Sequence, residues 1–190
     1  MKYDTNKKMT KFAERTLKDF ARTLFWTLKT KPLEKITVNE LCEAANYPRA
    51  TFYNYFDDIY DLLNYCWTRI ARDMVIDDYA SLDPEKRTDI LFERCYDYLS
   101  GYQDNVTKIM EHNSDEGQFA ESLRKYIRQQ IYNILISCPP SRQYRLSYEQ
   151  MAEHYANTIQ MILSWCFLRK DQMKKKDALD ALHYLLGGIQ

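Results

Sequence analysis

Apolar residues recur along most of the chain at the three- and four-residue spacing of one helix face. The clearest stripe lies between Thr10 and Lys29, and its members are Leu17, Phe20, Ala21, Leu24, Phe25 and Leu28. Further stripes follow over about 57–78, 84–100, 116–137, 148–170 and 175–186. With only four Gly and five Pro, the chain favours long helices and has few turn signals. The pattern predicts an all-α fold of about nine helices, with a polar tail at 1–8 and an exposed loop at 138–146.

The stretch 36–56 has a different apolar pattern, because two short segments with helical spacing are separated by a predicted turn. Thr37 is a predicted N-cap, and apolar residues follow it at helical spacing. Asn46 is the non-glycine type that best tolerates the left-handed conformation, so it can close a tight turn. Pro48 suits the first turn of a new helix, which we expect to run to about Tyr55. Two short helices joined by a three-residue turn form a helix-turn-helix, whose second helix enters a DNA major groove.

The residue types in this stretch carry a family resemblance. The matching positions are Ile36, Thr37, Val38, Leu41, Ala44, Ala45, Thr51, Phe52, Tyr53 and Phe56. Together they resemble the signature of the tetracycline-repressor (TetR) family of bacterial transcription regulators, over roughly residues 10–63. The resemblance implies a three-helix DNA-binding domain at 1–56 and a helical ligand-binding and dimerisation domain at 57–190.

Three positions depart from the family pattern. Asn46 stands where glycine is usual, and Pro48 stands where a serine commonly caps the recognition helix. Ile59 stands where a lysine commonly touches a phosphate, so that contact is not carried over to this chain.

The predicted recognition helix supplies side chains for both parts of DNA recognition, base reading and phosphate binding. Arg49 is the best base reader, because a guanidinium can donate two hydrogen bonds to one guanine. Tyr53 matches a family tyrosine that typically binds a phosphate, although burial of Tyr53 and Tyr55 against the next helix is the alternative. We interpret Phe52 and Phe56 as core. The predicted DNA contacts are Lys35, Thr37, Arg49, Thr51, Tyr53, Asn54 and Tyr55.

The distribution of charge agrees with a DNA-binding N-terminal part. The net charge of the whole chain is zero, but residues 1–56 carry 11 basic and six acidic residues, a net charge of +5. The remaining residues carry 16 basic and 21 acidic residues, a net charge of −5. A basic part on an acidic remainder suits a segment that meets phosphates.

Aromatic and sulfur-containing side chains are frequent in the second part and could line a cavity for a hydrophobic or cationic small molecule. The alternative is that they are plain core. The candidate ligand residues are Tyr98, Tyr102, Met110, Tyr126, Tyr155, Met161 and Trp165. The three histidines are isolated, so neither a metal site nor a cofactor is expected.

The stretch from Met161 to Leu168, MILSWCFL, is apolar nearly all round its helix. A helix that is apolar on every side must meet something beyond its own core, which predicts a two-fold helical dimer interface with the last helix. The alternative is that both helices are simply core. The candidate interface residues are Leu163, Phe167, Leu179, Leu182 and Leu186.

The five cysteines are dispersed and never in C-x-x-C spacing, which argues against a disulfide framework and a zinc site and favours a reducing cytoplasm. Small buried hydrophobes are the main interpretation, and a redox sensor is the alternative. The first residues contain no apolar signal-peptide core, and no apolar run reaches the roughly 20 residues of a membrane span.

The sequence contains no phosphate-binding glycine loop, nucleophile elbow or HExxH motif, so an enzyme is not predicted. We expect a ligand-responsive repressor that binds a palindromic operator as a homodimer and is released by a hydrophobic or aromatic effector. The alternative from another class is an all-helical adaptor that binds proteins and has no sequence-specific DNA binding.

Overall fold

The computed structural model describes residues 10–139 and 145–187, and all regular secondary structure within these residues is helical. Nine α-helices and two short 3₁₀ helices occur in the described part, which has no strand. The all-α prediction is therefore confirmed. The polar tail expected at 1–8 and residues 140–144 of the expected loop lie outside the described residues.

The internal contacts divide the chain into two compact units. The first, called the head below, holds the described residues up to Ile70 together with Lys108–Ser122. The second, called the body, holds Ala71–Thr107 and the described residues from Leu123 onward. A domain boundary after residue 56 remains a prediction, since contacts group the chain by packing and assign a later segment to the head.

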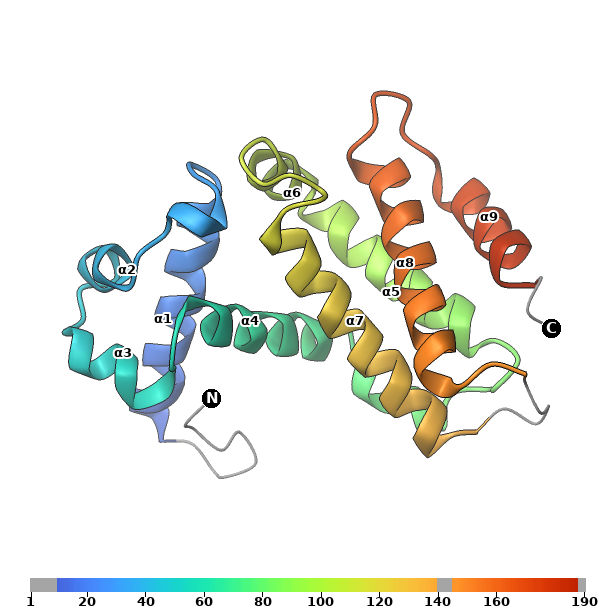
Figure 1. Cartoon of the computed structure of the whole chain (residues 1–190), viewed down its shortest axis with the longest axis horizontal. Helices are drawn as coiled ribbons and strands as arrows, with labels where there is room; N and C mark the ends of the chain where they lie inside the picture. Colours follow the sequence, from blue (N-terminus) through green and yellow to red (C-terminus); the bar gives the residue numbers. More distant parts are fainter. Residues whose placement is uncertain (1–9, 140–144, 188–190) are drawn as a thin grey trace. The chain divides into compact units, whose positions relative to one another are not determined.

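The head is built on α1 (Lys11–Leu28), which packs against α2 (Val38–Ala45) (Figure 1). A 3₁₀ helix, η1 (Leu33–Lys35), precedes α2, and α3 (Arg49–Tyr55) follows it. The predicted stripe of α1 is buried against the two short helices: the ring centroid of Phe20 lies 5.3 Å from that of Phe52 and 6.3 Å from that of Phe56. All three rings are fully buried, so Phe52 and Phe56 are core, as the sequence predicts.

Helix α4 (Ile59–Asp73) begins where an Asp58 carboxylate oxygen accepts a 2.8 Å hydrogen bond from the Asp61 backbone N–H. The expectation that this helix continues to about residue 78 is wrong. Val75 has a φ of 56° and a ψ of 43°, the left-handed conformation, which stops the α-helix. A second 3₁₀ helix, η2 (Ile76–Ser81), follows it.

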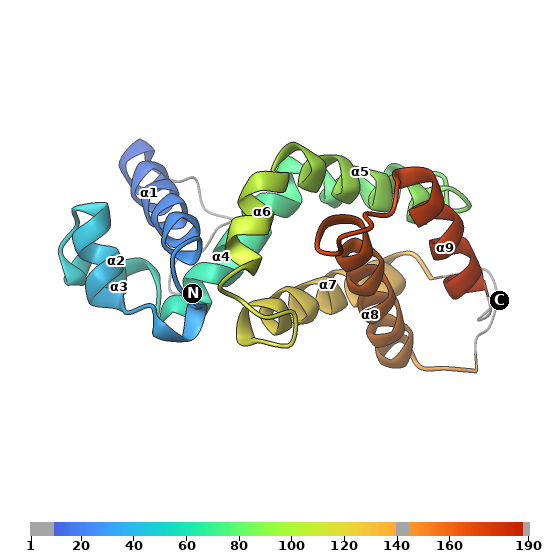
Figure 2. The same cartoon turned by 90° about the horizontal axis from the view of Figure 1, so that it is seen from above.

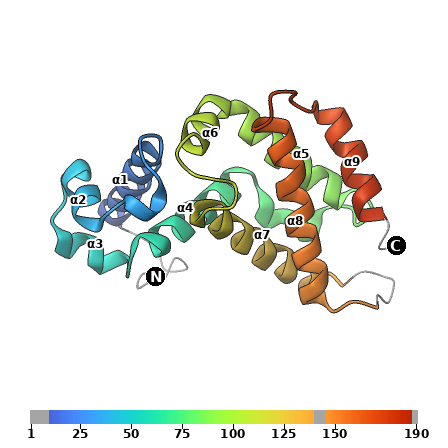
Figure 3. The ribbon, with the colours of Figure 1, turned by 45° about the horizontal axis from the view of Figure 1, so that its top comes forward.

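The body contains α5 (Arg87–Gly101), most of α6 (Gln103–Met110) and α7 (Gln118–Ser137), α8 (Tyr148–Phe167) and α9 (Lys175–Gly187). Helices α8 and α9 lie side by side, and α5 packs against both (Figure 2 and Figure 3). Ser147 caps α8 in a capping box with Gln150, so the N-cap predicted there is confirmed.

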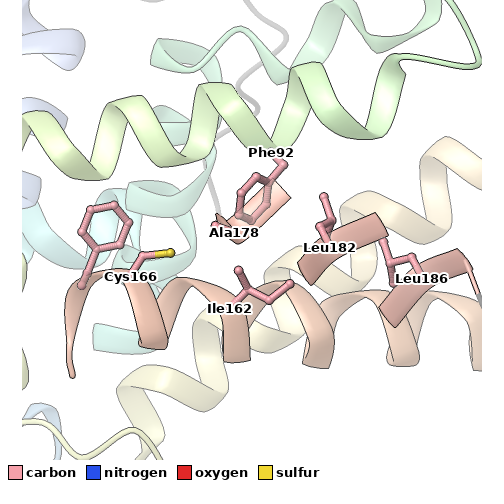
Figure 4. Packing of buried hydrophobic residues seen from close by; sticks show 7 residues of the cluster. Phe92, Ile162, Cys166, Ala178, Leu182 and Leu186 are labelled. Atoms are coloured by element: carbon pink, nitrogen blue, oxygen red, sulfur yellow. The ribbon is translucent and has the colours of Figure 1, made fainter. Parts of the chain in front are cut away.

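The body core lies between α5, α8 and α9. Its buried members are Phe92, Ile162, Cys166, Phe167, Ala178, Leu182 and Leu186. Figure 4 shows Phe92 of α5 above Ile162 and Cys166 of α8, with Leu182 and Leu186 of α9 beside them. Two polar contacts add to this packing: Lys175 forms an ion pair with Asp97 at 2.9 Å, and a ring nitrogen of His183 lies 2.7 Å from an Asp89 carboxylate oxygen.

Candidate nucleic-acid interface

The start of α2 is held by a reciprocal cap. The Thr37 hydroxyl accepts a hydrogen bond from the Glu40 backbone N–H at 3.3 Å, and a Glu40 carboxylate oxygen accepts one from the Thr37 N–H at 3.4 Å. Lys31 also pairs with Glu40, and this hydrogen bond is the main reason that the pKa of Glu40 lies below its ordinary value. Thr37 and Lys35 are both exposed at this end of α2, where free backbone N–H groups attract anions.

The turn between α2 and α3 depends on Asn46. Its φ of 58° and ψ of 45° place it in the left-handed conformation, and its N–H donates to the Cys42 and Glu43 carbonyls. The Tyr47 N–H donates to the Cys42 carbonyl at 2.9 Å, so the turn closes the end of α2 as the sequence predicts. Pro48 is extended and occupies the N-cap position of α3 without a side-chain cap.

Helix α3 turns one face inward and the other to solvent. Phe52 is fully buried, whereas Arg49, Tyr53 and Asn54 are exposed. Thr51 and Tyr55 are partly exposed. The exposed face therefore carries hydroxyl, amide and guanidinium groups, which are the groups that read base edges and bind phosphates.

Arg49 and Tyr53 contact one another along this exposed face. A guanidinium nitrogen of Arg49 donates to the Tyr53 hydroxyl at 3.3 Å, and the guanidinium carbon lies 5.7 Å from the centre of the Tyr53 ring. This i, i+4 contact is at the outer limit of a hydrogen bond and within the range of a cation–π interaction. Tyr53 thus holds the guanidinium on the outer face of α3.

Sequence reasoning missed a tether between α1 and the turn. The Tyr47 hydroxyl donates to an Asp19 carboxylate oxygen at 3.0 Å, and its ring lies 5.2 Å from that of Phe20. The same carboxylate forms ion pairs with two arginines: a guanidinium nitrogen of Arg22 lies 3.0 Å from one oxygen, and one of Arg15 lies 3.9 Å from the other. Asp19 carries no signal of this role in the sequence, because 28 residues separate it from its partner.

An open groove of about 430 Å³ lies beside the turn. It is lined by Asn39, Cys42, Glu43, Asn46, Tyr47, Pro48 and Arg49. Asn39 and Glu43 were not among the predicted contacts, but they are exposed on α2 next to Arg49 and belong to the same surface.

The start of α4 offers no phosphate site. Asp57, Asp58 and Asp61 surround it, and the Asp57 N–H is already bonded to Asp61 at 3.1 Å. Three carboxylates repel an anion, which agrees with the absence of a lysine at Ile59.

Comparison with solved structures finds proteins of the same fold. A protein of Syntrophomonas wolfei described as a TetR-family transcriptional regulator matches with a TM-score of 0.60 and 13% identity, covering 91% of this chain and 94% of that one. DhaS, a dihydroxyacetone kinase operon activator, matches with a TM-score of 0.54, 20% identity and coverages of 92% and 96%. A Clostridium perfringens protein described as a fatty acid metabolism regulator matches with a TM-score of 0.55, 16% identity and coverages of 90% and 98%.

The chain has the TetR fold. No protein-family profile matches the sequence, and a search of curated proteins finds no match either. The TetR likeness is therefore carried by the three-dimensional structure over nearly the whole chain.

The predicted ligand residues lie in both units: Met110 is in the head, and the other six are in the body. Tyr98 and Tyr102 are neighbours at the end of α5, with ring centroids 4.9 Å apart, and Tyr102 is half exposed. Tyr155 and Trp165 pack on the body core, and Tyr126 is partly buried. Met110 belongs to the head, and Met161 is exposed on α8. A binding role for these seven residues remains a prediction.

The predicted dimer residues differ in exposure. Phe167, Leu182 and Leu186 are buried in the body core, where α5 covers the α8–α9 pair. Leu163 and Leu179 are partly buried at the edge of that core. The exposed apolar side chains of the two helices are instead Met161 at 38% exposure and Tyr184 at 85%, with Leu168 at 36% just after α8.

All five cysteines are free: Cys42, Cys66 and Cys166 are buried, and Cys95 and Cys138 are partly buried. Burial raises the pKa of Cys66 to about 12 and the pKa values of Cys95 and Cys166 to about 11. A thiol with so high a pKa is almost entirely protonated at neutral pH and is a poor nucleophile. This chemistry favours the packing interpretation over the redox sensor at these three positions.

The described residues include no group of three or more His, Cys, Asp or Glu side chains placed to hold a metal ion. His183 pairs with Asp89, and His112 is exposed. Among the helices that the structure describes, none has the length and apolar character needed to cross a membrane.

Proposed function

We propose that the chain is a DNA-binding transcriptional regulator whose α3 reads an operator in the major groove. The observation that carries the proposal is the exposed polar face of α3, with Arg49 and Tyr53 in contact on it and Phe52 anchoring its other face. The N-terminal charge of +5 supplies the attraction for phosphates. The TetR fold of the whole chain supports the same function.

Each side chain on this face has a proposed role. Arg49 reads a guanine edge, and Thr51 and Asn54 contact bases or sugar and phosphate groups beside it. Tyr53, Tyr55 and Lys35 bind phosphates, as does the start of α2 at Thr37. Since Ile59 offers no cation and Pro48 no hydroxyl, these groups carry more of the phosphate binding.

The proposed active form is a homodimer, because two recognition helices related by a two-fold axis can each bind one half-site of an operator. The half-sites of a roughly palindromic operator then lie about 10–10.5 base pairs apart or a multiple of that distance. The exposed Tyr184, Met161 and Leu168 favour α8 and α9 as the interface. A small molecule bound in the body and preferring a form that cannot fit DNA would release the operator.

The experiment is a gel shift with DNA fragments flanking the protein's own gene, repeated over a series of salt concentrations. We expect Arg49→Ala to weaken binding to the cognate fragment by about 1–3 kcal/mol and to relax one base preference. Arg169→Ala is the matched control, because Arg169 is exposed in the body, and it should leave the affinity unchanged.

Equal weakening of cognate and random DNA by Arg49→Ala would show that Arg49 only touches phosphates. If the wild-type protein bound none of these fragments at low salt, the DNA-binding proposal would fail and a protein-binding adaptor would replace it.

A further inference from the structure

The head contains a segment from far along the chain. Lys108–Ser122 belongs to the same compact unit as α1, α2 and α3. Ile109, Phe119 and Ala120 of this segment are buried to 7% exposure or less. Trp67 of α4 packs on Phe119 with ring centroids 5.3 Å apart, and its indole N–H donates to the Ser122 hydroxyl at 3.0 Å. The segment is therefore part of the head core.

Asn113 makes the buried polar contacts between this segment and the first helices. Its side-chain oxygen accepts a hydrogen bond from the Leu33 backbone N–H at 2.8 Å. Its side-chain nitrogen donates to the Leu28 carbonyl at 3.2 Å and to the Ile109 carbonyl at 2.9 Å. The residue is 3% exposed, so these three bonds are shielded from water.

Each backbone partner of Asn113 lies at a helix end. Leu28 is the last residue of α1, so its carbonyl has no partner further along that helix. The Ile109 carbonyl, in the last turn of α6, also accepts from the His112 and Asn113 backbone N–H groups. Leu33 is the first residue of η1, whose N–H is likewise unpaired within that helix. One amide thus satisfies two orphan backbone groups in the core, the Leu28 carbonyl and the Leu33 N–H, and joins the end of α1 to the start of η1.

A second contact holds η1 on its exposed side. A Glu34 carboxylate oxygen accepts a 3.1 Å hydrogen bond from the Gln118 backbone N–H at the start of α7. Only Ile36 separates η1 from Thr37, the N-cap of α2. The position of η1 therefore sets where α2 begins, and the short turn at Asn46 passes that position on to α3.

We propose that Asn113 is a positioning residue for DNA reading. It fixes η1 against the end of α1, and so aims α2 and α3, without touching DNA itself. The inference rests on the proposed function. It implies that the segment Lys108–Ser122 helps to position the helix-turn-helix in the proposed operator-reading head.

The test compares three variants of the full-length protein. Asn113→Ala removes all three bonds, whereas Asn113→Asp keeps the acceptor for the Leu33 N–H and removes both donations. His112→Ala is the matched control, because His112 is the exposed neighbour of Asn113 in the same segment. Circular dichroism verifies folding, and Asn113→Asp carries the test if Asn113→Ala does not fold.

Two measurements are made on each variant. Hydrogen exchange of the Leu33 amide reports the hydrogen bond from that amide to the Asn113 side-chain oxygen. We expect the exchange to be at least about tenfold faster in Asn113→Ala, which corresponds to a loss of about 1.4 kcal/mol. Gel shifts measure the affinities for cognate and random DNA, and their ratio shows whether α2 and α3 are correctly placed. Random binding is electrostatic and tolerates misplacement, so we expect about tenfold weaker cognate binding with less than about threefold weaker random binding.

Unchanged Leu33 exchange would overturn the proposal. So would an equal loss of cognate and random affinity, which indicates general destabilisation instead of misplacement. If the wild-type protein prefers no fragment, the proposed function fails separately, and the amide chemical shifts of residues 38–55 then decide: shifts in the Asn113 variants support positioning, and unchanged shifts refute it.

Discussion

At the scale of single residues, the head is organised by residues that act at helix ends, Thr37 and Asn113 through side-chain hydrogen bonds and Asn46 through its left-handed backbone. Thr37, Asn46 and Asn113 each act at a helix end, where backbone groups have no partner within their own helix. Arg49 is different, because its partner is the Tyr53 side chain on the open face of α3. Thr37 therefore both caps α2 and is proposed to meet a phosphate, whereas Asn46 and Asn113 shape the head without a proposed DNA contact.

The Glu40 carboxylate gives a pH-dependent prediction at this scale. Its pKa is lowered chiefly by the hydrogen bond from Lys31, so the folded state favours its ionised form. A lowered pKa in the folded state contributes stability above the unfolded value, and this stability is lost as pH falls through the folded value. The affected window therefore lies below the ordinary value of 4.5.

We expect Glu40→Gln to remove this acid dependence and to cost at most about 1 kcal/mol at neutral pH, because the pair is partly exposed. Urea unfolding between pH 3 and pH 7 measures it. Glu43→Gln, on the exposed face of the same helix, is the control. A wild-type and a Glu40→Gln curve that stay parallel over this range would contradict the assignment.

At the scale of elements, helix ends decide where the chain changes direction. Asn46 and Val75 are the two non-glycine residues with positive φ among those described, and each stands at the end of a helix. Asparagine adopts this conformation readily, but a β-branched residue does so at a cost. At Val75 the strained backbone is held by Arg94 of α5, which donates to the Val75 carbonyl at 2.5 Å and to Asp78 at 2.6 Å.

Relief of this strain is testable. Val75 is 51% exposed, so replacing its side chain loses little apolar burial. We expect Val75→Asn to raise the free energy of unfolding by about 1 kcal/mol, since asparagine tolerates positive φ. Val75→Ala is the control, because alanine also shortens the side chain but lacks the polar group with which asparagine supports the left-handed conformation. If alanine stabilised the protein as much as asparagine in urea unfolding, the left-handed conformation would not be the cause.

At the scale of the whole molecule, the chain forms two units that are not consecutive in sequence. The head takes Lys108–Ser122 from the middle of the chain, and the body begins within α4 at Ala71. A fragment that ends at residue 56 lacks Asn113 and Trp67, both buried parts of the head. The proposed operator-reading surface therefore belongs to a unit that includes residues far along the chain.

The proposed dimer gives a prediction at this scale. Tyr184 is 85% exposed in α9, and a carboxylate in its place would be desolvated in an interface. We expect Tyr184→Glu to raise the dimer dissociation constant by at least about tenfold, or about 1.4 kcal/mol, in analytical ultracentrifugation. Leu146→Glu is the control, because Leu146 is an exposed apolar residue outside the helices. A wild-type protein that sediments as a monomer at micromolar concentration would refute the dimer.

Local features of the head were predictable because they depend on neighbouring residues. The spacing of Phe20, Phe52 and Phe56 places one ring on the inner face of each packed segment, and the structure buries all three. The N-cap at Thr37 and the left-handed Asn46 follow from side-chain chemistry within four residues. The end of α4 was not predictable in this way, since Arg94, 19 residues after Val75, helps to hold it.

The helices, the helix-turn-helix and the polar face of α3 could be predicted from the amino-acid sequence, because helical periodicity and capping act over a few residues. Packing decided which apolar faces are covered: Phe167 and Leu182, two of the candidate interface residues, are buried under α5 within one chain, and their role in a dimer stays a prediction. It also decided the tether of Tyr47 to Asp19 and the joint at Asn113, which span 28 and at least 80 residues. Periodicity shows that a face is apolar, but packing alone selects its neighbour.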